Sequence, residues 1–205
     1  MIETMTDRID GRSARRSRNR DVVIESALAL VAEGDDDPSV ERLTAHSGLS
    51  ARSIFRYFDG LDDLRRAVIA RNFERVSPLL EIPEIGKGSL ADRITRFVDA
   101  RVKVNETMAG TARTAYLRAP YVPVIAEDIA RYRKLLDATV RQHFAPELKK
   151  KSKAEADDLV SVIDVIASFD SWDIMTRQHR RNRSQIKRSL TAALESILGL
   201  AKKGR

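Results

Sequence analysis

The sequence predicts an all-α protein of about nine helices, and three observations support this fold class. Apolar residues recur at three- and four-residue spacing in most segments, which is typical of amphipathic helices. The second half of the chain shows no strand signal. A short segment, residues 39–58, has the pattern of two helices joined by a tight turn.

Composition narrows the class of protein. The chain has 205 residues, enough for one large domain or two small ones with their own cores. It contains no cysteine, and its three histidines lack metal-ligand spacing, so we expect no metal and no cofactor. No apolar run approaches the ~20 residues that span a bilayer, and the N-terminus lacks the apolar core of a signal peptide. We therefore expect a cytoplasmic protein with no membrane partner.

Residues 1–17 are predicted to form a flexible basic arm. Five arginines lie between positions 12 and 20 with no acid among them, and Arg15, Arg16 and Arg18 are the DNA contacts we expect from this region. Such an arm either binds phosphates or a minor groove, or stays solvated. The net charge of +7 does not decide between these, because residues 1–60 hold nine arginines against eleven acidic residues.

Residues 18–60 are expected to form a helix-turn-helix DNA-binding domain. The first helix runs from 18 to 33, where apolar residues recur at helical spacing. Ser39 caps the second helix, Gly48 ends it with a left-handed backbone, and Ser50 caps the third. The small core expected beneath the pair is Val40, Leu43, Leu49, Ile54, Phe55 and Phe58.

The exposed face of the third helix is the expected DNA-reading surface. Two guanidinium groups, two hydroxyls and one small side chain suit a DNA groove. These residues are Ala51, Arg52, Ser53, Arg56 and Tyr57. Ser39 and Ser50 are expected to contact phosphate through a hydroxyl or a backbone N–H.

This region resembles the DNA-binding domain of the TetR family of transcriptional regulators, over about residues 18–75. The family's Tyr-x-His-Phe corresponds to residues 55–58, its Ser-Lys-Glu-Glu-Leu to residues 60–64, and its Ala-x-x-Ala-Gly to residues 44–48. Phe55 lacks a phosphate-binding hydroxyl, and Leu61 replaces a lysine, whereas Tyr57 can still reach a phosphate. The resemblance implies a homodimer that binds double-stranded DNA at a pseudo-palindromic operator under control of a small-molecule effector.

The rest of the chain is expected to hold a connecting helix, residues 61–80, and a regulatory and dimerisation domain, residues 81–205. Pro78 should distort or end the connecting helix, and the Pro- and Gly-rich segment 81–89 marks the junction. Further helices are expected at 90–107, 111–119, 122–144, 154–180 and 184–201, with a loop at 145–153. Ser89 caps the first of these, and Gly110 separates it from the second.

The helix expected at 154–180 is apolar on nearly all sides, so it must be buried on nearly all sides. We expect half of that burial to come from a second copy of the chain, with the last helix completing a four-helix interface. The alternative is a helix central to its own domain.

Arg101 interrupts an apolar stripe on the helix expected at 90–107. Because an unpaired buried charge is costly, it either pairs with Asp170 or Asp173, or contacts an anionic or carbonyl group of an apolar ligand. The ligand site expected in the second case is Phe97, Arg101, Val104, Met108, Tyr116, Phe169, Trp172 and Asp173.

No catalytic motif stands out, so we expect no enzyme. The favoured function is a dimeric repressor that a small molecule releases from its operator. Two alternatives remain at this point. One is an activator or partner-controlled regulator without a small-molecule site, and the other is a non-DNA-binding adaptor that kept the fold.

Overall fold

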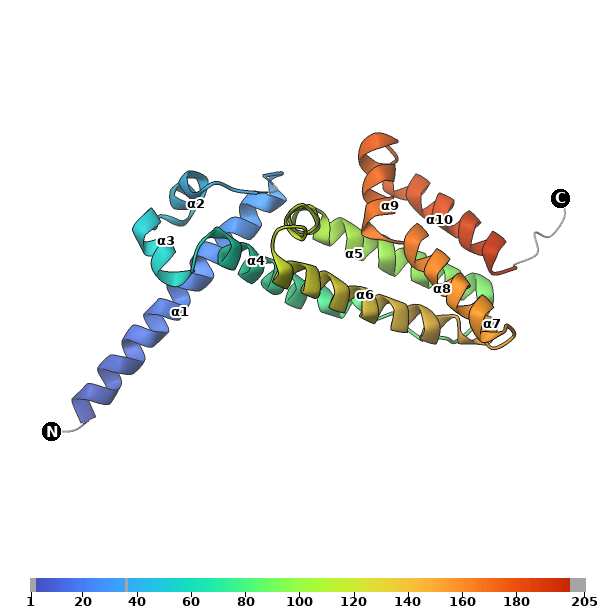
Figure 1. Ribbon diagram of the computed structural model, residues 1–205, viewed down its shortest axis with the longest axis horizontal. Helices are drawn as coiled ribbons and strands as arrows, with labels where there is room; N and C mark the ends of the chain where they lie inside the picture. Colours follow the sequence, from blue (N-terminus) through green and yellow to red (C-terminus); the bar gives the residue numbers. More distant parts are fainter. Residues whose placement is uncertain (1–2, 36, 200–205) are drawn as a thin grey trace. The chain divides into compact units, whose positions relative to one another are not determined.

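The computed structural model describes residues 3–35 and 37–199, with side chains from Ser13 onward (Figure 1). The regular elements of these residues are helices, with no strand, which confirms the predicted all-α class. No helix in the described ranges combines the length and apolar character that a membrane crossing requires. The chain divides into two compact units, one of Met1–Glu74 with Gly110–Ala126 and one of Arg75–Ala109 with Glu127–Arg205.

The first unit is built on α1 (Glu3–Ala32), α2 (Val40–Ser47), α3 (Ala51–Tyr57) and most of α4 (Leu61–Val76). Helices α1, α2 and α3 pack on one another. Their shared core, with the start of α4, consists of Val23, Ile24, Ala27, Leu28, Leu30, Leu43, Ile54, Tyr57, Phe58, Leu64 and Val68.

Helix α1 starts at Glu3, where we predicted a flexible arm through residue 17. The apolar spacing that predicted this helix begins only near Val22 and Val23, and the residues before it are polar. A helix can extend past its apolar face, because each residue added to an existing turn closes a further backbone hydrogen bond.

Helix α5 (Leu90–Arg118) is continuous, so the predicted break at Gly110 is wrong. Glycine inside a helix costs only about 1 kcal/mol relative to alanine. The residues that follow are buried in the first unit, where the Asn72 amide donates to the Thr111 hydroxyl over 2.5 Å and Arg118 pairs with Asp37. These contacts hold the last turns of α5 in helical form.

The second unit contains the N-terminal part of α5 and most of the later elements. A 3-10 helix, Ser77–Leu80, follows α4 and includes Pro78. This confirms the prediction that Pro78 distorts or ends the α-helix. The later elements are α6 (Pro123–His143), α7 (Ala145–Leu148), α8 (Lys153–Ile166), α9 (Phe169–Asp173), a π-helical turn (Ile174–Gln178) and α10 (Arg183–Ile197).

Two predictions for this unit are wrong. The segment 145–153 was expected to be a loop, yet its first residues form α7. The helix expected at 154–180 is interrupted at Ala167–Ser168. Ser168 caps α9 by accepting from the Ser171 N–H, and the buried Asn105 amide donates to the carbonyls of both interrupting residues, each over 3.4 Å. Side chains thus replace the helical bonds lost at the break.

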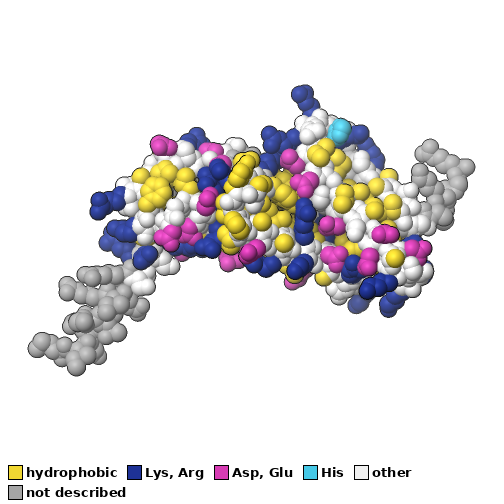
Figure 2. Space-filling model, in the orientation of Figure 1, with side chains coloured by type: hydrophobic (Ala, Val, Ile, Leu, Met, Phe, Trp, Pro, Cys, Tyr) yellow, Lys and Arg dark blue, Asp and Glu magenta, His cyan; other side chains and the backbone are white. Residues whose placement is uncertain are grey.

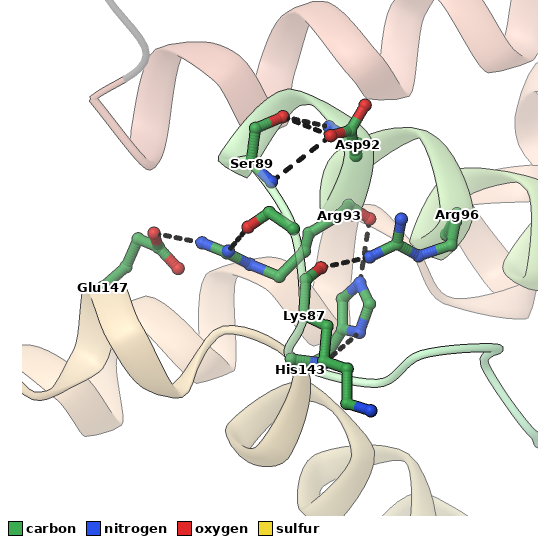
Figure 3. A network of polar contacts seen from close by, with 9 residues as sticks. Lys87, Ser89, Asp92, Arg93, Arg96, His143 and Glu147 are labelled. Carbon is green, nitrogen blue, oxygen red and sulfur yellow. Dashed lines mark hydrogen bonds and ion pairs between the residues drawn. The ribbon is translucent and has the colours of Figure 1, made fainter.

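A polar network holds the loop before α5 against the helices of the second unit (Figure 3). His143, at the end of α6, is fully buried. Its Nδ1 accepts from the Gly86 N–H at 3.3 Å, and its Nε2 lies 2.9 Å from the Arg93 carbonyl. Since Nδ1 can accept only without a proton, these contacts select the neutral ring with the proton on Nε2.

Arginines of α5 complete this network. The Arg93 guanidinium donates to the Gly88 carbonyl over 2.6 Å and pairs with Glu147, while Arg96 donates to the Lys87 carbonyl (Figure 3). The predicted cap at Ser89 is confirmed, since its hydroxyl accepts from the Asp92 N–H at 3.2 Å.

Candidate DNA-binding surface and effector site

The turn between α2 and α3 forms as its caps predict. The Ser39 hydroxyl accepts from the Arg42 N–H at 3.4 Å, and the Ser50 hydroxyl accepts from the Ser53 N–H at 3.3 Å. Gly48 has φ +68° and donates its N–H to the Thr44 carbonyl. Both cap serines are exposed at the start of their helices, where backbone N–H groups face outward and favour a phosphate.

Two aromatic residues of α3 lie on the opposite sides from those predicted. Tyr57, expected at the DNA surface, is only 7% exposed, whereas Phe55, expected in the core, is 48% exposed. Residues 54, 57 and 58 share one helical face, and position 55 falls on the other. The Tyr57 hydroxyl accepts from the Asn19 amide at 2.9 Å and from Arg56 at 2.8 Å, and these donors, Asn19 first, lower the pKa of that hydroxyl.

The exposed residues of α3 are Ala51, Arg52, Phe55 and Arg56, with Ser53 half-buried. The Arg56 guanidinium also lies 5.1 Å from the centre of the Tyr57 ring, so the core tyrosine orients it. Arg52 makes no ion pair or hydrogen bond with any residue that the structure describes. Figure 2 shows basic and hydrophobic side chains next to each other over α2 and α3.

The basic part of α1 lies beside α3. Arg15, Arg16 and Arg18 are exposed, and Arg16 donates to the Arg56 carbonyl over 3.4 Å. The Arg20 guanidinium lies 4.9 Å from the centre of the Phe58 ring. The expected arm residues are therefore presented on a helix next to the third helix of the motif.

Several acidic residues of the first unit pair with other arginines. Asp35 pairs with Arg42, Asp37 with Arg65 and Arg118, and Asp62 with Arg65. Burial raises the pKa of the Asp37 carboxyl, but hydrogen bonds from its two arginines outweigh this and lower the pKa overall. Arg71 of α4 likewise lies 2.6 Å from Asp21 and 2.9 Å from Glu25, which are both on α1. Among the described residues, Arg15, Arg18 and Arg52 have no acidic partner, so positive charge is left on α1 and α3.

Arg101, in the second unit, is buried with few partners. Its side chain is 5% exposed and lies 4.9 Å from the centre of the Phe97 ring. Among the described residues it donates one hydrogen bond, to the Leu136 carbonyl at 3.2 Å. Neither predicted acid pairs with it: Asp170 instead lies 3.5 Å from Arg133, and no acid of the described ranges comes within ion-pair distance of Arg101. Guanidinium has five N–H donors, so most are unused.

Asp164, which was not among the predicted partners of Arg101, acts on it electrostatically. Burial lowers the pKa of Arg101, against weaker opposite effects of Tyr132 and Asp164. Burial likewise raises the pKa of the half-buried Asp164, and Arg101 counteracts it only partly. The two groups therefore influence each other without forming a contact.

The expected ligand-site residues are distributed over both units. Phe97, Val104, Phe169 and Trp172 are buried in the second unit, with Met108 and Asp173 half-buried, whereas Tyr116 belongs to the first unit. The rings of Phe169 and Trp172 lie 5.8 Å apart. The buried Trp172 Nε1 has no hydrogen-bond partner among the described residues, so this unit holds a further unused donor.

Solved structures show what this arrangement is similar to. A TetR-family transcriptional regulator from Streptomyces coelicolor aligns over 90% of this chain and 82% of its own, with a TM-score of 0.69 and 16% identity. The chain has the TetR-family fold. EbrR, a multidrug-binding protein in complex with imidazole, matches this fold over 90% of the chain and 97% of its own, with a TM-score of 0.60 and 16% identity.

A transcriptional regulator from Aquifex aeolicus also shares the TetR-family fold. It covers 87% of the chain and 99% of its own, with a TM-score of 0.58 and 16% identity. No protein-family model and no curated protein sequence matches the chain. The likeness thus lies in the fold, as the resemblance over residues 18–75 predicts.

Asn105 and Asp164 were not among the expected site residues. Asn105 follows Arg101 by one helical turn, so it is a second polar residue in the apolar stripe, and the same periodicity could have found it. Asp164 could not be found in this way, because its place near Arg101 depends on how α8 packs against α5.

Proposed function

We propose that this protein is a dimeric transcriptional regulator that represses from a pseudo-palindromic operator and is released by a small molecule. The carrying observation is a set of arginines on α1 and α3 that lack acidic partners among the described residues, while several acids of the same unit pair with other arginines. Free guanidinium groups beside a capped helix-turn-helix suit phosphates and guanine edges. The TetR-family fold supports the same function.

Selection from a random double-stranded DNA library tests DNA binding directly. The full-length protein should enrich a pseudo-palindrome whose half-sites lie about one helical turn apart, roughly 34–36 Å. The same sequence should occur in DNA close to the protein's own gene. Enrichment of no sequence, with equal binding of promoter and random DNA, would instead favour the non-DNA-binding adaptor.

We propose that the dimer interface lies on α8 and α10. Val162 and Val165 of α8 remain 46% and 64% exposed, and Ile174, after α9, is 43% exposed. Leu194 of α10 is fully buried within one chain, so a charge there would unfold the protein and could not report on assembly. The exposed valines are better probes.

Replacing Val165 with Glu should convert the dimer to a folded monomer, because a carboxylate in an apolar interface is costly to bury. Leu135→Glu is the matched control, since Leu135 is 51% exposed on α6, outside the proposed interface. Light scattering at micromolar concentration measures both. A dimer that persists in the Val165 variant, or a wild-type monomer, contradicts the interface.

The effector is proposed to bind at Arg101 and to be an otherwise apolar molecule with an anionic or carbonyl group. Unused donors on Arg101 and Trp172 call for an acceptor, and Phe97 and Val104 supply apolar surface. EbrR, with the same fold, is described as multidrug-binding. A panel of aromatic and aliphatic carboxylates should contain members that raise the melting temperature and lower operator affinity. If none does, the activator or partner-controlled alternative is favoured.

A further inference from the structure

Phe55 is a large apolar side chain at the centre of a surface otherwise suited to DNA. With about 100° of rotation per residue, the exposed residues of α3 follow the order Ala51, Phe55, Arg52, Arg56 around the helix. Phe55 therefore lies about 40° from Ala51 and about 60° from Arg52. One half of the exposed face is apolar, and the other half carries two guanidinium groups.

Phe55 faces outward because other residues of α3 occupy the side that faces the core. Ile54, Tyr57 and Phe58 fill the core side of α3, and the polar end of Tyr57 is satisfied by Asn19 and Arg56. The ring of Phe55 thus meets whatever binds the face that holds Arg52 and Arg56. The unpaired positive charge on both α3 and α1 argues that this partner is a polyanion.

In the major groove, the apolar feature is the C5-methyl group of thymine, which alanine and phenylalanine contact. Arginine contacts the O6 and N7 atoms of guanine in the same groove. We propose that Phe55, next to Ala51, reads a thymine methyl in each half-site, close to the guanine read by an arginine of α3. This inference rests on the proposed DNA binding and adds a base preference that phosphate contacts cannot supply.

Deoxyuridine substitution tests the inference, because deoxyuridine pairs like thymidine but lacks the methyl group. Each thymine of the sequence enriched by the wild-type protein is replaced singly, and binding is measured by fluorescence anisotropy. Loss of one buried methyl should weaken binding about fourfold at one position in each half-site. Phe55→Ala should bind the thymine and uracil forms of that position equally, while Phe55→Tyr, which keeps the ring, should still distinguish them.

Val22→Ala is the matched control, since Val22 is a 43% exposed apolar residue of the same unit on α1. It should keep the full sensitivity to the methyl group. Thermal unfolding checks that all variants are folded, and library selection repeated with Phe55→Ala should return the same motif without the thymine preference.

Three results would overturn the inference while leaving DNA binding intact. The first is that no thymine shows a methyl effect that depends on Phe55. The second is that the folded Phe55→Ala variant enriches no sequence, which is a larger loss than one methyl contact explains. The third is that this variant enriches an unchanged motif with unchanged affinity, as expected if the ring faces a protein. Failure of the wild-type protein to enrich any DNA would instead remove the proposed function, and this inference with it.

Discussion

Both units contain an arginine that has no acidic partner among the described residues, in opposite surroundings. Arg52 on α3 is exposed to solvent, whereas Arg101 on α5 is 5% exposed and makes one hydrogen bond to a described residue, at a backbone carbonyl. An exposed guanidinium costs the fold nothing, because water solvates it. A buried one has lost that hydration without gaining an ion pair. The first arginine should therefore matter to binding alone, and the second to both binding and stability.

Removing the exposed arginines should have the largest effect. An Arg52→Ala, Arg56→Ala double variant should lose about 1–3 kcal/mol of operator binding for each arginine that reads a guanine. Thermal stability should change little, because both side chains are exposed and Asn19 still donates to the Tyr57 hydroxyl. Anisotropy with the enriched operator measures the first effect and thermal unfolding the second.

Lys134→Ala is the control for charge alone, since Lys134 is an exposed residue of α6 in the second unit. It should keep operator affinity. A double variant that binds as tightly as the wild type would refute the placement of the DNA surface on α3.

Arg101 should behave in the opposite way. Arg101→Met removes a buried charge and keeps apolar volume, so it should raise the stability of the ligand-free protein by about 1–4 kcal/mol. Operator binding should persist, while the response to the apolar carboxylates that act on the wild type should be lost. Denaturant unfolding and ligand-dependent release of DNA are the two measurements.

The opposite outcome has a clear meaning. If Arg101→Met is strongly destabilised and still responds to ligand, Arg101 serves the internal structure, through Leu136 and the more distant Asp164. Comparing this variant with the Arg52 and Arg56 variant then separates a buried structural cation from exposed binding cations.

The two units also differ in how much the sequence could predict. In the first, the caps at Ser39 and Ser50 and the turn at Gly48 were predicted correctly, because each depends on a few adjacent residues. The exchange of Phe55 and Tyr57 was missed, although helical periodicity alone places position 55 opposite the core. Phe55 was assigned to the core because it is apolar, and Tyr57 to the surface because it carries a hydroxyl.

Among the later helices, α5 to α10, the errors arose from contacts distant in sequence. Gly110 was taken as a helix end, but buried neighbours such as Thr111 keep α5 continuous. The break at Ala167–Ser168 was missed because Asn105, some sixty residues earlier, supplies the bonds that make it possible. Arg101 was recognised as anomalous from its place in an apolar stripe. Its lack of an ion pair depends on tertiary packing, which periodicity does not specify.

His143 is another buried basic side chain, but its imidazole can become neutral, whereas the guanidinium of Arg101 cannot. Burial, and then the nearby charges of Arg96, Arg93 and Arg101, lower the pKa of His143, and the hydrogen bond to the Arg93 carbonyl only partly opposes this. Protonation at Nδ1 would also break the bond from the Gly86 N–H. The folded protein therefore resists protonation, whereas the unfolded chain takes up the proton near pH 6.5.

Because the unfolded state then binds more protons, stability should be constant above about pH 6.5 and fall as the pH drops below it, towards the lowered pKa of the folded state. Urea unfolding at a series of pH values between about 7 and 5 measures this slope. His143→Gln should remove it, whatever its effect on stability at pH 7, while His179→Gln, at an exposed histidine, should leave it unchanged. An equal slope in wild type and His143→Gln would show that His143 is not the group that titrates. The bond from Gly86 would then place no constraint on the protonation of this ring.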